Sequence, residues 1–149
     1  MLRDDGPFGE LTEWIIECGI EVHGTLGPGL FESVYAACLV TELRDRGLRV
    51  QEKCRVPVNY KGQPLEPTLV VDVIVEEIVV VELKAVELLL PVHMSQVVTY
   101  LKLTGCPVGL LMNFNVPLLK QGVRRYLHPT LYGELHQKPV PSKPEASRP

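Results

Sequence analysis

Two valine-rich segments, separated by only three residues, constrain the fold of this chain more than any other feature. Residues 69–75 and 79–84 are β-branched runs, and their closeness in sequence predicts two antiparallel neighbouring strands. Because alternate residues of a strand point to opposite faces, both segments are apolar on both faces. The sequence therefore predicts an α/β domain in which helices pack on the faces of a sheet.

Three ionisable residues, Asp72, Glu82 and Lys84, interrupt these apolar segments. Two carboxylates and an ammonium among valines destabilise a fold unless they pair or hold an ion. Their arrangement depends on the hairpin loop. A three-residue loop at 76–78 places Asp72 opposite Glu82, whereas a two-residue loop pairs Asp72 with Val81 and separates the carboxylates. We expect the three-residue loop, because the alternative leaves two charges without an evident partner.

The remaining periodicities predict three helices, three further strands and an irregular tail. The chain of 149 residues suits one domain, expected at 8–128, and the proline-rich stretch 137–149 is expected to be disordered. Apolar residues at helical or extended spacing, bounded by glycine and proline, define the other elements. We expect helices at about 11–24, 30–46 and 91–104, strands at 50–60, 108–112 and 122–127, and a turn at 61–64.

Composition restricts the function classes. The net charge is −3 and the pI is near 5.8, and the tail is basic, so the folded body carries about −5. The chain therefore lacks the overall positive charge that is typical of proteins that bind nucleic acids. The four cysteines form no C-x-x-C pair, which argues against a zinc knuckle or a thioredoxin-like motif. Neither a membrane span nor a signal-peptide core is evident, so we expect a soluble cytoplasmic protein that does not contact membranes.

The carboxylates and the lysine have a chemical interpretation. Carboxylate oxygens are the ligands that Mg²⁺ prefers, and a bound ion activates water and neutralises charge in phosphoryl chemistry. Lys84, two residues after Glu82, is suited to orient that water or to stabilise an oxyanion. On residue types alone this pattern is weak, and a Glu82–Lys84 ion pair at a solvent-facing strand end is the simpler interpretation.

Two helices contribute further candidates. Glu32 borders the apolar face of the second predicted helix, but near a helix start it could instead reach back toward Gly29 and cap the helix. On the third predicted helix, His93, Gln96 and Tyr100 fall at i, i+3 and i+7 and form a narrow polar stripe. The stripe could face a phosphate backbone or simply solvent.

Several of these residues belong to motifs that resemble the GxxExxY protein family, which is placed within the PD-(D/E)XK nuclease superfamily. The segment Gly29-Leu-Phe-Glu32-Ser-Val-Tyr35 matches the G-x-x-E-x-x-Y signature. The resemblance covers roughly residues 11–126. It continues through further motifs in order: Glu21-Val-His23, Leu26-Gly-Pro-Gly29, Tyr60-Lys-Gly62, Asp72, Val81-Glu82-Leu-Lys84-Ala, Gln96-x-x-x-Tyr100-Leu and Asn113-Phe-Asn115.

The resemblance implies a PD-(D/E)XK nuclease-like mixed β-sheet flanked by helices, with two N-terminal helices. It implies that Glu32, Asp72 and Glu82 are the metal ligands and that Lys84 is the catalytic lysine beside Asp72 and Glu82. The activity implied is hydrolysis of phosphodiester bonds with Mg²⁺ or Mn²⁺. Nucleic acid is then the partner, with DNA favoured over RNA, and a homodimer is left open. Gln96 and Tyr100 match a helix motif of exonuclease-like members, and with His93 they are the expected substrate-binding residues.

The chain also departs from the family pattern. Arginines are common after the histidine of the first helix and two residues before the strand aspartate, where this chain has Gly24 and Val70. These losses and the acidic body favour an alternative, a non-catalytic module that binds nucleic acid or a protein. The complete set of carboxylates and lysine favours the enzyme. His23 lies on an apolar helical face, where we expect a hydrogen-bonded core histidine.

Overall fold

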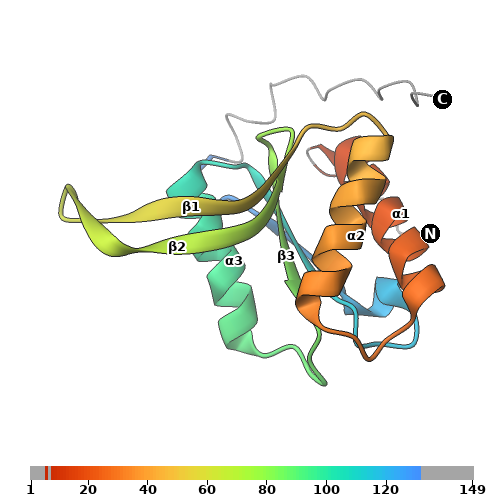
Figure 1. The fold of residues 1–149 in the computed structure, drawn as a ribbon. Coiled ribbons are helices and arrows are strands. Elements are labelled where there is room, and N and C mark those ends of the chain that lie inside the picture. The colour runs from red at the N-terminus through yellow and green to blue at the C-terminus, as the bar shows by residue number, and fades with distance from the viewer. Residues whose placement is uncertain (1–5, 7, 132–149) are drawn as a thin grey trace.

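A computed structural model describes residue 6 and residues 8–131 (Figure 1). All the predicted helices and strands are present, and the third helix has the predicted bounds. The predicted disordered tail lies outside the described residues. The elements are α1 (Gly9–Leu26), α2 (Glu32–Asp45), β1 (Val50–Tyr60), β2 (Gln63–Val75), β3 (Val79–Lys84), α3 (Pro91–Thr104), β4 (Val108–Asn113), the short 3₁₀ helix η1 (Leu119–Gly122) and β5 (Val123–Leu127).

The strands form one mixed sheet in the order β1-β2-β3-β4-β5. Only β3 and β4 pair in parallel, and α3 provides the crossover that a parallel pair requires. Val75 pairs with Val79 across the β2–β3 hairpin, so the loop has the three residues that the sequence predicted. The architecture confirms the expected α/β fold, a mixed sheet flanked by helices with two helices before the sheet.

Helices cover both faces of the sheet, as the two-sided apolar strands predicted. The helices α1 and α2 pack on one face and α3 lies against the other (Figure 1). The core under α1 and α2 is the larger; Leu11, Ile15, Tyr35, Leu39, Leu83 and Phe114 are among its fully buried residues. No helix within the described residues is long and apolar enough to span a membrane.

The alternation of β2 breaks at Asp72, and here the sequence-based prediction was wrong. We expected the odd-numbered residues of 69–75 to share one face. Instead Val71 packs in the core of α3, whereas Val73 packs in the core of α1 and α2. The pairing of β1 with β2 passes over Lys53 and Asp72, and Lys53 adopts a left-handed conformation with φ 47°. This irregularity re-aims the strand and frees Asp72 from the regular pleat.

Beyond Asp72 the two long strands leave the sheet as a ribbon. β2 pairs with β3 only at Val73–Val75, whereas its pairing with β1 continues to the turn at Tyr60 and Gln63. Figure 1 shows the β1–β2 ribbon crossing α3, with its turn projecting beyond the helix. We call the place where β2 and β3 separate, between Asp72 and Glu82, the fork.

Candidate active site

Asp72 lies at the fork, where its side chain replaces the backbone hydrogen-bond partner that β3 would have if the β2–β3 pairing continued. Its Oδ2 accepts a hydrogen bond of 3.1 Å from the backbone N–H of Leu83 on β3. In a continuing hairpin, a donor at this edge would be paired with backbone. The carboxylate is therefore held at the edge of β3, beside Glu82, as the three-residue loop predicted.

Glu82 is a buried carboxylate whose partners are incomplete. The residue is 4% exposed, and its Oε1 lies 3.6 Å from Nζ of Lys84. Its Oε2 is buried and has no hydrogen-bond partner. The Glu82–Lys84 ion pair therefore exists, but the prediction that it faces solvent was wrong, because the Lys84 side chain is only 15% exposed. One ammonium at this distance does not satisfy both carboxylate oxygens.

The electrostatic state of Glu82 follows from this burial. Loss of solvation and, second to it, the adjacent charge of Asp72 raise the pKa of Glu82 to about 9, against the opposing effect of Lys84. The closeness of the Asp72 carboxyl group thus favours the neutral form of Glu82. Without a cation, Glu82 is therefore protonated at neutral pH.

Gln96 and Tyr100 of α3 form a hydrogen-bonded pair, and Tyr100 lies close enough to Glu82 and Asp72 for their charges to act on it. Nε2 of Gln96 donates a 2.9 Å hydrogen bond to the hydroxyl of Tyr100, which is 5% exposed. Burial raises the pKa of the Tyr100 phenol, and the charge of Glu82 adds to the shift. The solvent-facing alternative for the polar stripe was therefore wrong for this pair.

His93 has a different place in the same stripe. Its Nδ1 accepts a 2.9 Å hydrogen bond from the backbone N–H of Leu90, the N-cap residue of α3, while the N–H of His93 donates to the Leu90 carbonyl at 3.0 Å. Because Nδ1 is the acceptor, Nε2 carries the proton of the neutral ring. The bond fixes the ring at the helix end and leaves Nε2 as its remaining donor.

Glu32 approaches the site from the other layer of the fold. It is the first residue of α2, and its Oε1 accepts a 3.4 Å hydrogen bond from the backbone N–H of Ala85, just after β3. The capping alternative was wrong, because α2 has no side-chain cap. Glu32 and Asp72 line one pocket of about 300 Å³; its other lining residues are Ser33, Ala36, Ala37, Val40, Glu52, Lys53 and Val73.

These carboxylates approach one another but do not form a closed cage. Among the described residues, no three Asp, Glu, His or Cys side chains are gathered tightly enough to hold a metal ion in the present arrangement. Asp72 and Glu82 nevertheless fit a divalent cation, since both offer carboxylate oxygens and Oε2 of Glu82 lacks a partner. A cation there would replace the proton that Glu82 carries without it.

Asn113 stabilises the end of β3, a role that the sequence did not reveal. It is 2% exposed; its Oδ1 accepts from the N–H of Val86 at 3.0 Å, and its Nδ2 donates to the Val86 carbonyl at 2.9 Å. The N–H of Phe114 also donates to the carbonyl of Lys84. The segment after β3 is therefore fixed to β4. The signals in the sequence were a polar residue ending a fully apolar strand and the Asn113-Phe-Asn115 motif of the family resemblance.

Tyr35 stabilises the turn before α2. Its hydroxyl donates to the Gly27 carbonyl at 2.6 Å and accepts from the N–H of Leu30 at 3.1 Å, while its ring stacks on Phe114 at 4.5 Å. The residue is fully buried. The start of α2, and with it Glu32, is therefore positioned by the core.

His23 is buried, and its Nε2 lies 2.8 Å from the Val116 carbonyl. This contact confirms the prediction of a hydrogen-bonded core histidine, and it connects α1 to the segment after β4.

Comparison with known proteins agrees with this geometry. The sequence model of the PD-(D/E)XK nuclease superfamily matches residues 9–126, which includes all the helices and nearly all of the sheet. Searches of curated proteins and of solved structures gave no match. The match spans well over half of the chain, and it contains the fork with its two carboxylates and the lysine. The chain belongs to the PD-(D/E)XK nuclease superfamily.

Proposed function

We propose that this protein is a metal-dependent nuclease that hydrolyses phosphodiester bonds of DNA or RNA. Asp72 and Glu82 hold Mg²⁺ or Mn²⁺, and Glu32 adds a third carboxylate. The observation that carries the proposal is the buried Glu82 carboxyl group beside Asp72, with one oxygen unpartnered. Such an arrangement destabilises the fold unless a cation compensates it. Members of the superfamily generally are nucleases that use divalent metals.

The protein's own groups have distinct roles in this proposal. When bound, a divalent cation acidifies water and offsets negative charge at phosphorus. Lys84 adds a fixed positive charge, 3.6 Å from Glu82, that stabilises the negative charge developing on the phosphoryl oxygens. Because Gln96 donates to the Tyr100 oxygen, the Tyr100 proton is directed elsewhere, to a carboxylate or to the substrate. Burial on the α3 side keeps bulk water from screening these charges.

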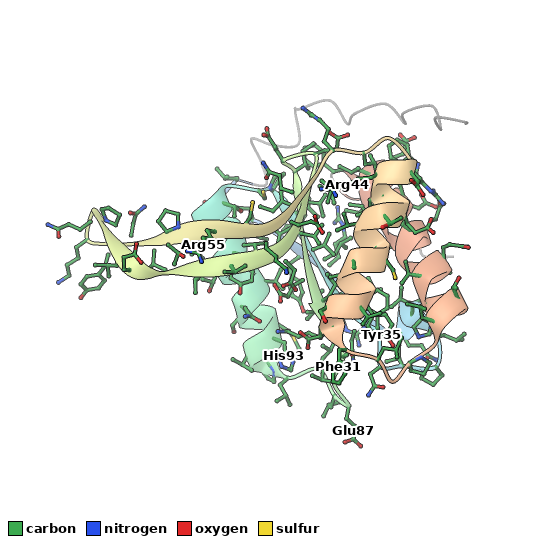
Figure 2. All side chains as sticks on the ribbon, viewed as in Figure 1. Phe31, Tyr35, Arg44, Arg55, Glu87 and His93 are labelled. Carbon is green, nitrogen blue, oxygen red and sulfur yellow. The ribbon has the colours of Figure 1, made fainter. Side chains whose placement is uncertain are left out.

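Basic residues on β1 support a nucleic-acid partner despite the acidic body. Glu52 is paired with Arg44, whereas no ion pair of Lys53 or Arg55 is found in the part of the chain that the structure describes. Both are exposed, and Figure 2 shows Arg55 on the β1–β2 ribbon beyond the fork. Lys53 lines the pocket of Asp72 and Glu32. We propose that phosphates contact this side of the ribbon.

Calorimetric titration with Mg²⁺ and Mn²⁺, together with oligonucleotide binding and cleavage, tests the proposal. We expect negligible nucleic-acid binding in EDTA, salt-sensitive binding with Mg²⁺ or Ca²⁺, and cleavage with Mg²⁺ or Mn²⁺ only. Asp72→Ala should abolish ion binding, whereas Glu77→Gln, an exposed carboxylate in the β2–β3 loop, should leave it intact.

The alternative is a non-catalytic module that binds nucleic acid or a protein. The net negative charge and the absence of a preformed three-ligand cluster among the described residues favour it. The same assays separate the two functions. Tight nucleic-acid binding in EDTA, unchanged in Asp72→Ala, would establish the module and reject the metal site.

A further inference from the structure

Phe31 is the most exposed of the large apolar side chains in the described residues, at 81%. It precedes Glu32 and stands at the N-cap position of α2, where its backbone, and not its ring, serves the helix. The carbonyl of Phe31 accepts from the N–H groups of Val34 and Tyr35 at 3.1 and 3.4 Å. The ring therefore contributes neither to the cap nor to the core. An aromatic side chain left in water is a candidate for contact with a ligand.

The segment that carries Phe31 is rigid. On its N-terminal side, Tyr35 holds the turn through Gly27 and Leu30. On its C-terminal side, Glu32 is hydrogen-bonded to Ala85. The ring is therefore presented from a fixed backbone, and binding would cost little ordering entropy.

The ring also lies next to the proposed metal site. A shallow hollow is lined by Phe31 and Glu32 together with Leu30, Ser33 and Ala85. Ala85 directly follows Lys84, the proposed charge-stabilising residue. Figure 2 shows Phe31 at the end of the molecule where β3 gives way to the segment before α3. A phosphate at the carboxylates would therefore place the adjoining nucleoside near this hollow.

We propose that Phe31 stacks on an unpaired nucleobase next to the scissile phosphate, so that the substrate is single-stranded or has an open end. This inference rests on the proposed nuclease function and adds a substrate class to it. Inside a duplex, both faces of a base are already stacked, whereas a base in a single strand has a free face for an aromatic ring. Every base offers such a face, so the contact would select strand state and not sequence.

A tryptophan at this position provides a direct probe. The chain has one tryptophan, Trp14, which is 5% exposed in the core. We expect the added indole of Phe31→Trp to report stacking by fluorescence quenching when a short single-stranded oligonucleotide is added with Ca²⁺. The matching duplex should give little quenching. Phe31→Ala should weaken single-strand binding about 5- to 100-fold, the range for one stacked base, and leave duplex binding unchanged.

Ile20→Ala on α1 is the matched control, since Ile20 is an exposed apolar residue at 47% on another element. Equal single-strand affinity in Phe31→Ala and wild type would overturn the stacking role, and metal-dependent binding by both would leave the proposed function standing. No metal-dependent binding by wild type would overturn both. If sedimentation shows wild-type self-association that Phe31→Ala abolishes, while oligonucleotide affinity is unchanged, the ring is a protein contact and the inference fails.

Discussion

The two ends of the β2–β3 hairpin have similar sequences and opposite character. At the closed end, Val73, Val75, Val79 and Val81 are paired and fully buried, so both backbone and side chains are satisfied. At the open end, the strands separate, a side chain replaces a backbone partner, and a buried carboxylate oxygen is unpaired. The comparison teaches that the two functions lie at different ends of one short hairpin: the closed end stabilises the fold, and the open end carries the candidate reactive groups. The packed valines of the closed end stabilise the hairpin. This stability compensates for the unfavourable burial of the Glu82 carboxyl group at the fork.

The largest effect should come from making the closed end resemble the open one. Val81→Asp places a carboxylate in the core under α1 and α2, where no cation or ammonium compensates it. We expect a loss of at least about 3 kcal/mol in the free energy of unfolding. Urea denaturation measures the loss. A stability within about 1 kcal/mol of wild type would contradict the contrast between the two ends.

The next effect concerns the charge at the open end. Lys84→Ala should preserve metal-dependent nucleic-acid binding but reduce the single-turnover cleavage rate about 10²- to 10³-fold, because it removes charge stabilisation without removing a ligand. Lys102→Ala, an exposed lysine in the last turn of α3, is the control and should cleave normally. Cleavage by Lys84→Ala at the wild-type rate would remove Lys84 from the mechanism.

The pH dependence of stability tests the burial of Glu82. Its pKa is raised in the folded protein, so the folded state holds a proton that the unfolded state releases near pH 4.5. The stabilisation is therefore complete below pH 4.5 and is lost as pH rises toward about 9. In EDTA at pH 8, Glu82→Gln should be more stable than wild type by at least about 2 kcal/mol, since the pKa of Glu82 rises from 4.5 to about 9 and each unit is worth about 1.4 kcal/mol.

Thermal melts across pH measure this difference. Mg²⁺ should raise the melting temperature of wild type at pH 8 and leave that of Glu82→Gln nearly unchanged. Parallel pH curves for the two proteins would mean that Glu82 is solvated and ionised, contrary to its position in the structure.

The smallest effect separates the two roles of Asp72. Asp72→Asn keeps an oxygen for the N–H of Leu83 and should change stability by less than about 1 kcal/mol, whereas Asp72→Ala leaves that donor unpaired and should cost about 1–3 kcal/mol. Both should lose metal binding. Denaturation curves in EDTA measure the difference, and equal stabilities would mean that the hydrogen bond does not close the fork.

The sequence predicted the elements and the hairpin loop because these depend on local periodicity. Strand and helix periods identified every α-helix and strand but not the short 3₁₀ helix η1, and two charges without an alternative partner indicated the loop length. The sequence did not predict that the alternation of β2 side chains breaks at Asp72. The break accompanies a left-handed backbone conformation at Lys53, which the pattern of apolar residues does not indicate. The sequence also placed the start of β2 at residue 69, six residues late, since the exposed ribbon lacks a buried face.

The candidate site divides in the same way. Strand spacing and the hairpin loop predicted that Asp72 and Glu82 lie together, and the register agrees. The role of Gln96 and Tyr100 came from the family resemblance, because helix spacing alone left their stripe open between substrate and solvent; the structure joins the two by a hydrogen bond. The contact of Glu32 with Ala85 depends on how α2 crosses the sheet, which is a tertiary property. Spacing within one element could not reveal it.

The stacked pair of Tyr35 and Phe114 has a consequence for mutational screens. Both rings are fully buried and touch no part of the fork, yet Tyr35 fixes the turn from which Glu32 is displayed. Truncating Phe114 would let that turn shift, and the variant would score as inactive while remaining folded. A survey that ranks residues by lost activity would then assign a catalytic role to Phe114, although this side chain only positions the turn before Glu32.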